Sequence, residues 1–328
     1  MLAVLLTQPD LSEENMAVVE VPNIEPPLPG HVIVAVEFAG CNFADTMMRR
    51  GTYPHPKGYP LVAGLEVAGT INAVGAGVTG WKVGDRVAGF TEDSGGFAEF
   101  CSIPAGALIA IPDTVGFDVA AAFPVQGLTA WHLLHTVSTT NKGDTLLIHA
   151  IGGGVGLYLT QLAKKAGATV IGTIGTAGKE KRALEFGAHK VINRNEEDFV
   201  SAVMKFTDGK EIDKIVDSTG GTILDSSFKT IHRLGHVVSY GEAEAKPQNN
   251  LWEQLVHKSL TFTRLHLGHI DRNSEAWGKA VREVVAMVEN GELKVPIEEV
   301  FPLERVHDMY AKLESRQVSG KLLLKVAP

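Results

Sequence analysis

The stretch Leu147–Gly156, which reads LIHAIGGGVG, decides the fold of this chain. It starts as an apolar run typical of a buried strand, continues through three consecutive glycines, and enters an apolar helical pattern near Gly154. A second apolar run, Ala168–Thr173, follows that helix. This order of strand, glycine turn, helix and strand is the layout of a dinucleotide-binding unit.

The glycine turn departs from the strict G-x-G-x-x-G fingerprint. With Gly156 as the third glycine of the pattern, the first glycine falls on Ile151. A glycine run alone also occurs in tight strand–helix connections that bind nothing, but the strand before it and the helix after it favour binding. Glycines let the backbone approach a pyrophosphate, and a helix N-terminus offers N–H groups. The backbone that we expect at the phosphates is that of Gly152, Gly153, Gly154 and Val155.

The residues after the second strand indicate which dinucleotide is bound. No acidic residue occurs between Gly156 and Lys179, whereas an NAD-binding unit places Asp or Glu there to bond the ribose 2′-hydroxyl. The strand carries Thr173 near its end and leads to Thr176 and then Lys179. A carboxylate would repel a 2′-phosphate, and a lysine attracts it. The sequence therefore predicts NADPH as the cofactor.

Composition excludes several classes of function. The chain has 328 residues, of which 45% are hydrophobic and 21% charged, and carries a net charge of −8. This acidic balance argues against a nucleic-acid or anionic-membrane surface, and no apolar run approaches the ~20 residues of a membrane span. The first residues show no basic leader, and Cys41 and Cys101 are too few for a disulfide framework. We expect a cytoplasmic protein with reduced thiols.

The chain changes texture along its length. Up to about Pro112 it is rich in strands separated by Gly and Pro, the segment Gly116–Val137 has a helical pattern, and from Gly143 strands and helices alternate. The alternating part predicts strands at 144–149, 168–174, 189–192, 212–217, 234–240 and 260–264. The helices between them are expected to start near Gly154, Ala177, Glu196, Gly221 and Asn250. The fold class is α/β, with a doubly wound parallel sheet.

The tail after Arg264 is too short to form a domain. It predicts a helix at 274–290, an extended piece at 297–301, a helix at 303–315 and a strand at 321–326. We expect it to pack on the N-terminal strands. Residues 1–124 and 265–328 then form a catalytic domain, and residues 125–264 form the cofactor domain.

Further motifs extend this pattern along the chain: AGCNFAD at 39–45, RGTYP at 50–54, VGDRV at 83–87, QGLTA at 126–130 and VSGK at 318–321. In this order and spacing the chain resembles the zinc-independent quinone oxidoreductases of the medium-chain dehydrogenase/reductase superfamily, essentially end to end. The resemblance implies a Rossmann cofactor domain, a GroES-like catalytic domain and a homodimer formed through the cofactor domains.

The sequence lacks the zinc ligands of other members of that superfamily. Zinc-dependent members carry Cys and His where this chain has Asn42 and Leu65, and a catalytic zinc needs three protein ligands. Cys41 lies one residue before the ligand position, so its side chain should point elsewhere, and both cysteines are interpreted as packing residues. The histidine pairs 132/135, 232/236 and 266/269 have no evident third ligand. We expect no metal.

Without a Lewis acid, the hydride acceptor must need little activation, as a quinone or an activated alkene does. Tyr53 is the candidate acid, because a phenol can donate to a developing oxyanion and related enoyl thioester reductases place their catalytic tyrosine at the matching position. Its alternative role is to line an apolar wall. Asn42 and Asp45 can bond near the nicotinamide ribose or the substrate, although Asp45 could instead serve the N-terminus of a helix. Met47 replaces a tyrosine of some quinone reductases and makes the predicted pocket more apolar.

The resemblance implies further cofactor contacts. They come from Gln126, Thr129, Tyr240, Gly241, Leu265 and Lys321. Lys321 could also simply flank a strand. Where relatives have a tyrosine near the adenine-phosphate end, this chain has Arg194. An arginine can pair with a phosphate through two hydrogen bonds, although a solvated role beside neighbouring glutamates remains open.

These observations predict an NADPH-dependent enzyme that transfers a hydride to a quinone. An enoyl or enone reductase on the same scaffold and a non-catalytic NADPH-binding protein are the alternatives. The predicted strand Leu260–Arg264 is an apolar edge strand. Open edges are liabilities unless they are paired, so we expect a homodimer in which this strand pairs with its copy.

Overall fold

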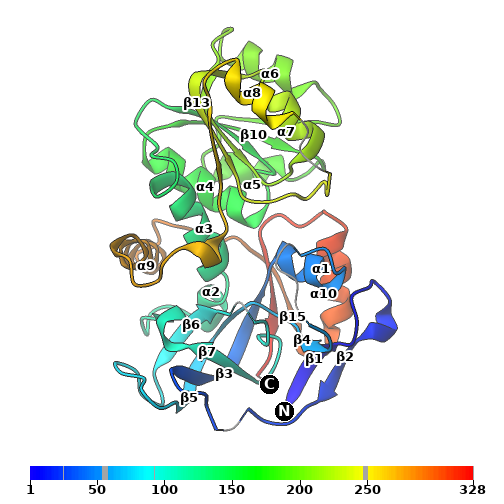
Figure 1. Ribbon diagram of the computed structural model, residues 1–328, viewed down its shortest axis with the longest axis vertical. Coiled ribbons are helices and arrows are strands. Elements are labelled where there is room, and N and C mark those ends of the chain that lie inside the picture. Colours follow the sequence, from blue (N-terminus) through cyan, green and yellow to red (C-terminus); the bar gives the residue numbers. More distant parts are fainter. Residues whose placement is uncertain (25, 54–57, 92, 247–249, 328) are drawn as a thin grey trace. The chain divides into compact units, whose positions relative to one another are not determined.

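The computed structural model describes residues 1–24, 26–53, 58–91, 93–246 and 250–327. The chain divides into two compact units (Figure 1): unit 1 contains Met1–Gln126 and Asp271–Pro328, and unit 2 contains Gly127–Ile270. The sequence placed the boundaries at 124/125 and 264/265, and the compact units divide at 126/127 and 270/271. Within the described residues, no helix combines the length and the apolar character that a bilayer span requires.

Unit 2 contains a six-stranded sheet in which every strand pair is parallel. Its strands are β9 (Thr145–His149), β10 (Thr169–Ile174), β11 (Lys190–Asn193), β12 (Ile212–Asp217), β13 (Ile231–Ser239) and β14 (Thr261–Arg264). Their spatial order is β11-β10-β9-β12-β13-β14. This is the doubly wound order, and it reverses between β9 and β12. The predicted fold class is confirmed.

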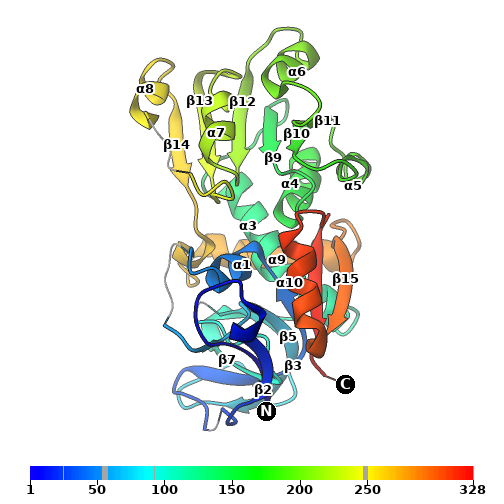
Figure 2. The ribbon, with the colours of Figure 1, turned by 90° about the vertical axis from the view of Figure 1, so that its right-hand side faces the viewer.

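Helices flank this sheet in both ribbon views (Figures 1 and 2). They are α4 (Gly154–Lys165), α5 (Glu180–Glu185), α6 (Phe199–Phe206), α7 (Gly221–Ser227) and α8 (Leu251–Val256), and a 3₁₀ turn, η3 (Leu267–His269), follows β14. Helices α5 and α6 each start three residues later than predicted. The start of α6 is set by Asp198, whose side chain accepts a hydrogen bond from the N–H of Ser201 at 2.8 Å.

The segment predicted as one helix between 116 and 137 forms two helices. They are α2 (Phe117–Ala120) and α3 (Pro124–His135). Pro124 is the first residue of α3, where the missing N–H of proline costs nothing because that donor has no intrahelical partner. Strand β13 begins at Ile231, three residues before the predicted start.

Unit 1 is built on two sheets. The larger has the order β15-β16-β3-β5-β6-β8, with β7 also paired to β3, and the smaller has the order β2-β1-β4. The larger sheet contains β3 (His31–Cys41), β5 (Glu66–Val74), β6 (Arg86–Phe90), β7 (Phe100–Pro104), β8 (Leu108–Ala110), β15 (Ile297–Pro302) and β16 (Lys321–Lys325). The smaller contains β1 (Leu2–Leu6), β2 (Met16–Glu20) and β4 (Leu61–Val62).

The helices of unit 1 come from both ends of the chain. They are α1 (Phe43–Arg49), α2, α9 (Glu275–Glu289) and α10 (Val306–Glu314), with 3₁₀ turns η1 (Glu13–Asn15), η2 (Ala105–Ala107) and η4 (Leu303–Arg305). Strand β16 pairs antiparallel with β3. The prediction that the tail packs on the N-terminal strands is therefore confirmed.

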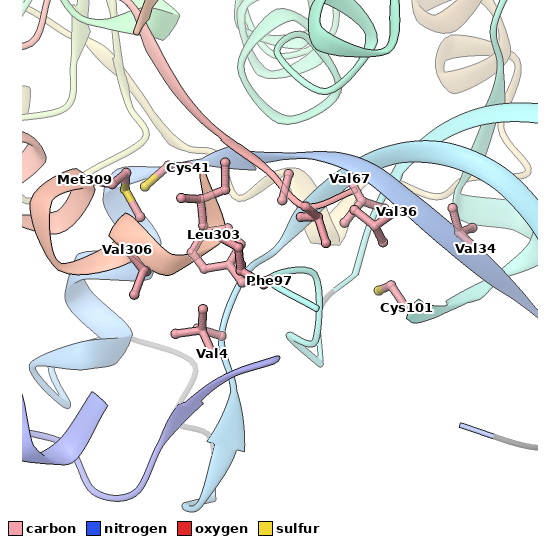
Figure 3. Packing of buried hydrophobic residues seen from close by; sticks show 14 of the residues in the cluster. Val4, Val34, Val36, Cys41, Val67, Phe97, Cys101, Leu303, Val306 and Met309 are labelled. Carbon is pink, nitrogen blue, oxygen red and sulfur yellow. The ribbon is translucent and has the colours of Figure 1, made fainter. Parts of the chain in front are cut away.

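Both cysteines lie in the hydrophobic core of unit 1 (Figure 3). Cys41 and Cys101 are buried and free, and Cys41 lies beside Met309 of α10. Burial raises the pKa of the Cys41 thiol and raises that of Cys101 to about 12. Both thiols are therefore packing residues, as the sequence predicted.

Candidate functional site

The glycine turn of unit 2 follows β9 and leads into α4. Gly153 precedes the helix and has no side chain to cap it, so the first N–H groups of α4 have no intrahelical acceptor. A Cβ atom on Gly156 would lie 2.6 Å from the carbonyl oxygen of Ile151, and only glycine fits there. The turn therefore keeps the start of α4 close to the backbone of Ile151 and leaves the first N–H groups of the helix available to an anion.

Ile151, which replaces the first glycine of the fingerprint, is fully buried. A Cβ atom on Gly172 of β10 would lie 2.3 Å from the Cδ1 of Ile151. The isoleucine therefore fills the space that Gly172 leaves on the neighbouring strand, which explains how the turn accepts it.

Lys179 lies against the glycine turn. A Cβ atom on Gly152 would come within 2.7 Å of the Cβ of Lys179, so the two residues pack directly. Lys179 immediately precedes α5, and Thr176 lies half-buried in the same loop after β10. The structure thus brings together the glycine turn and the basic residue that the sequence assigned to a 2′-phosphate.

Arg194 follows β11 and lies over the end of β10. Its Nη1 donates to the Oγ1 of Thr173 at 3.0 Å, and a Cβ atom on Gly175 would lie 3.0 Å from its Nη2. Burial lowers the pKa of Arg194 from its ordinary value, and the nearby carboxylates of Asp217 and Glu244 oppose that shift. Arg194 is therefore a held, half-buried cation, not a freely solvated one.

Asp217, at the end of β12, is a buried carboxylate that the sequence analysis did not single out. It accepts hydrogen bonds from the N–H groups of Thr219 at 3.0 Å and Gly220 at 2.8 Å. Burial raises the pKa of Asp217. The signal available in the sequence was an acidic residue at the end of the strand predicted at 212–217.

The residues after β13 join this edge of the sheet. The N–H of Tyr240 donates to the carbonyl of Asp217 at 2.9 Å, and a Cβ atom on Gly241 would lie 2.8 Å from the carbonyl oxygen of Ser218. Burial raises the pKa of the Tyr240 phenol. Leu265 is buried and lies one residue beyond the end of β14.

In unit 1, Asn42 belongs to a buried polar cluster. Its Oδ1 accepts from the Nζ of Lys321 at 2.7 Å, and its Nδ2 donates to the Oε2 of Glu66 at 2.9 Å. Lys321 and Glu66 form an ion pair, and both side chains are 0% exposed. The second oxygen of Glu66 accepts from the N–H of Val125 at 2.7 Å. We call Asn42, Glu66 and Lys321 the buried triad.

The buried triad does not fit a catalytic zinc. Both ends of the Asn42 amide are occupied within it, and the Lys321 ammonium would repel a dication at the same place. Leu65 offers no ligand atom. Among the residues that the structure describes, no group of three His, Cys, Asp or Glu side chains could hold a metal.

Asp45 lies in the first turn of α1 and is fully buried. Its Oδ2 accepts from the N–H of Asn42 at 2.7 Å, so it serves the helix N-terminus, the alternative that the sequence left open. Its Oδ1 has no hydrogen-bond partner. Burial raises the pKa of Asp45 to about 7, against the opposing effects of the Asn42 N–H and of Lys321.

The remaining predicted residues lie on α3 and after α1. Gln126 and Thr129 are both buried and stand three residues apart on α3. Tyr53 is half-buried and lies beyond the end of α1. Met47, which is within α1, is also half-buried. Pro54 of the same motif lies outside the described residues.

Comparisons with known proteins agree with this geometry. The family model described as zinc-binding dehydrogenase matches residues 154–286, and that of the alcohol dehydrogenase GroES-like domain matches residues 28–113. A quinone oxidoreductase of Pseudomonas aeruginosa is 34% identical, over 91% of this chain and 92% of its own length. The chain belongs to the quinone oxidoreductases of the medium-chain dehydrogenase/reductase superfamily.

Two further proteins similar to this chain are a quinone oxidoreductase of known structure and a reductase of a halogenated alkene acid. The structure of Escherichia coli quinone oxidoreductase, solved in complex with NADPH, matches with a TM-score of 0.93 at 33% identity and covers 99% of this chain and 100% of that one. A 2-haloacrylate reductase from a Burkholderia species is 33% identical over 91% of each chain.

We expect the buried carboxyl of Asp45 to reduce stability as pH rises. Its folded pKa of about 7 exceeds the ordinary value of 3.8, so the folded state keeps a proton that the unfolded state releases, and stability falls between these values. Asp45→Asn removes this effect. In urea unfolding, the variant should therefore gain stability relative to wild type from pH 5 to pH 8.

The control is Asp85→Asn, because the hydrogen bonds from Lys82 lower the pKa of the half-buried Asp85. Its curve should run parallel to wild type over this range. A parallel curve for Asp45→Asn would contradict the raised pKa.

Proposed function

We propose that this protein is an NADPH-dependent oxidoreductase that reduces a quinone without a metal ion. The observation that carries the proposal is the placement of Lys179 against the glycine turn and of Arg194 over the end of β10. These cations lie at the carboxyl ends of adjacent parallel strands, next to the point where the strand order reverses, the usual ligand edge of such sheets.

The same geometry fits the 2′-phosphate of NADPH. Between the glycine turn and Lys179 no carboxylate is present to bond a 2′-hydroxyl. Arg194 presents a planar guanidinium that suits phosphate. The backbone N–H groups at the start of α4 suit the pyrophosphate, and Thr176 lies in the loop between them. Bound there, NADPH would supply the hydride.

The protein's own groups then orient the acceptor and supply a proton. We assign proton donation or oxyanion stabilisation to Tyr53, with Asn42 and Asp45 in positioning roles, and cofactor contacts to Gln126, Thr129, Tyr240, Gly241 and Leu265. The Lys321 ammonium is shared with Glu66 and Asn42 in the buried triad, so its part is to fix the orientation of the Asn42 amide. The free buried thiols fit a cytoplasmic, reducing location.

An activated alkene is the second candidate acceptor. The relationship to a 2-haloacrylate reductase favours it, and Met47 gives the segment after the Asn-x-x-Asp motif an apolar side chain. A quinone and a conjugated alkene share the property that hydride arrival yields a delocalised oxyanion, so both need little electrophilic activation.

A panel of hydride acceptors tests the proposed reaction. NADPH oxidation is followed with benzoquinone, naphthoquinone, an enone and an enoyl thioester, each with and without a chelator. We expect turnover with quinones and no effect of the chelator, because the buried triad does not fit a metal. Activity that a chelator abolishes and zinc restores would contradict metal independence. Tight NADPH binding without turnover on any acceptor would contradict the reductase assignment.

Lys179→Met tests the cofactor assignment. The methionine retains the aliphatic packing on Gly152 but removes the charge. NADPH binding should weaken by about 1.5–3 kcal/mol, the range for hydrogen bonds to charged groups, and NADH binding should remain almost unchanged. The matched control is Lys181→Met, since Lys181 is 85% exposed and lies 3.9 Å from Glu185. Equal losses for both cofactors in a titration would refute the assignment.

We also propose a homodimer formed through β14. Within the described residues β14 pairs only with β13 and forms the edge of the sheet. The N–H of Leu265 donates to Ser239 of β13 at 2.8 Å. Because strand donors alternate in direction, the N–H of Phe262 points to the open edge. Nearby, Leu234, Trp252 and Val256 expose 76%, 77% and 51% of their surfaces, an apolar area that a partner would cover.

Phe262→Pro should convert the dimer to a monomer. It removes an outward donor while leaving the hydrogen bonds to β13 in place, and pairing about a two-fold axis needs that donor from both copies. Phe262→Val is the control, since it retains the N–H and should stay dimeric. Sedimentation at micromolar concentration measures both. A monomeric wild-type protein would show that the edge is covered from within the chain.

A further inference from the structure

His149, the last residue of β9, is a fully buried histidine that the proposed reaction does not use. Its Nδ1 lies 2.8 Å from the Oγ1 of Thr173, its partner on β10, and its Nε2 lies 2.7 Å from the Oγ of Ser227 at the end of α7. The ring of Phe199 meets it edge to face, with ring centroids 5.3 Å apart. The imidazole is therefore held on three sides within unit 2.

The donor and acceptor roles in this chain of groups follow from the hydroxyl of Ser227. Ser227 donates its only hydroxyl proton to the carbonyl of Ile223 at 2.6 Å, so it must accept from the Nε2 of His149. The Nδ1 of that ring is then unprotonated and accepts from the Thr173 hydroxyl. With its proton used in this way, the Thr173 oxygen is left to accept from the Nη1 of Arg194 at 3.0 Å.

His149 is neutral, so this arrangement does not change with pH in the physiological range. Burial, helped by the positive charge of Arg194, lowers the pKa of His149 to about 3. A protonated ring would donate from both nitrogens and could no longer accept from Thr173. The Thr173 hydroxyl would then lose the acceptor that turns its oxygen towards Arg194.

Arg194 needs such support because an arginine side chain is long and flexible. Among the described residues, its guanidinium makes one hydrogen bond, to Thr173. The remaining N–H donors stay available, and Gly175 leaves room beside Nη2, since a Cβ atom there would lie 3.0 Å away. The orientation of these donors therefore depends on Thr173, and through it on His149.

We propose that His149 is a positioning residue for cofactor selectivity: acting through Thr173, it aims the Arg194 guanidinium at the 2′-phosphate that distinguishes NADPH from NADH. This inference rests on the proposed NADPH binding and adds to it a residue that touches neither cofactor nor substrate. A purely structural role, in which His149 only joins β9, β10 and α7, would affect both cofactors alike.

The test compares two pairs of variants. His149→Phe retains an aromatic ring and removes both nitrogens, whereas His149→Asn places an oxygen near the former Nδ1 and can still accept from Thr173. Thr173→Val removes the hydroxyl at constant shape, and Thr173→Ser retains it. Calorimetric binding of 2′,5′-ADP and of 5′-AMP measures recognition of the 2′-phosphate without turnover, and kcat/KM for NADPH and NADH measures selectivity.

We expect His149→Phe and Thr173→Val to weaken 2′,5′-ADP binding about fivefold, the effect of one hydrogen bond, and to leave 5′-AMP within twofold of wild type. His149→Asn and Thr173→Ser should retain the wild-type ratio. Equal losses for the two ligands, or unchanged 2′,5′-ADP binding in His149→Phe, overturn the inference while wild-type selectivity for NADPH upholds the proposed function. A wild-type protein that binds both ligands equally overturns both. If His149→Phe does not fold, Thr173→Val and Thr173→Ser still test the contact through which His149 is proposed to act, and unchanged 2′,5′-ADP binding in Thr173→Val overturns the inference.

Discussion

The ion pair between Lys321 and Glu66 is the interaction on which the organisation of unit 1 depends. It joins residues 255 positions apart in the chain, and both side chains are completely buried. Through Glu66 it also fixes the N–H of Val125 at the start of α3, and through Lys321 it fixes the amide of Asn42 before α1. Breaking a buried pair costs about 3–5 kcal/mol, because one charge is left uncompensated. The C-terminal strand, the first helix and the entry to α3 therefore share one electrostatic anchor.

Two buried polar networks, one in each unit, treat charge in opposite ways. Unit 1 neutralises a full charge, and this uses the hydrogen-bonding capacity of Lys321 on groups inside the fold. Unit 2 instead buries an uncharged chain of groups, His149, Thr173 and Ser227, that ends on the cation Arg194. A neutral chain costs little desolvation as long as each donor meets an acceptor. It also leaves the charge at its end, where an anion can meet it.

Much of the fold was predictable because its signals are local. Each strand of the parallel sheet is a short apolar run, and most of their predicted bounds lie within one residue of the observed ones. Short helices were placed less well, since a side-chain cap such as Asp198 decides where they begin. Strand β13 extends three residues further back than its pattern shows, and its register with β12 shifts there, where Leu234 has a positive φ of 66°.

The candidate site was only partly predictable, for the same reason. The glycine turn, Lys179 and Arg194 carry their meaning in local sequence and spacing. Glu66 and His149 have partners that are 255 and 78 residues distant, and nothing in a single sequence indicates that those residues meet. Asn42 and Lys321 were both named from the sequence, but their contact with each other and with Glu66 appears only in the fold. Buried networks are therefore the part of a site that sequence patterns describe least.

The one local departure from the fingerprint shows how such networks compensate for it. The side chain of Ile151 would clash with the neighbouring strand β10 if residue 172 carried a side chain. Here Gly172 provides the space, since any Cβ atom on it would lie 2.3 Å from the Ile151 side chain. The Ile151 side chain thus occupies the space that a side chain at position 172 would otherwise fill, and the interior stays closely packed. The two positions behave as a single packing unit, so the turn keeps its backbone path although its first glycine is missing.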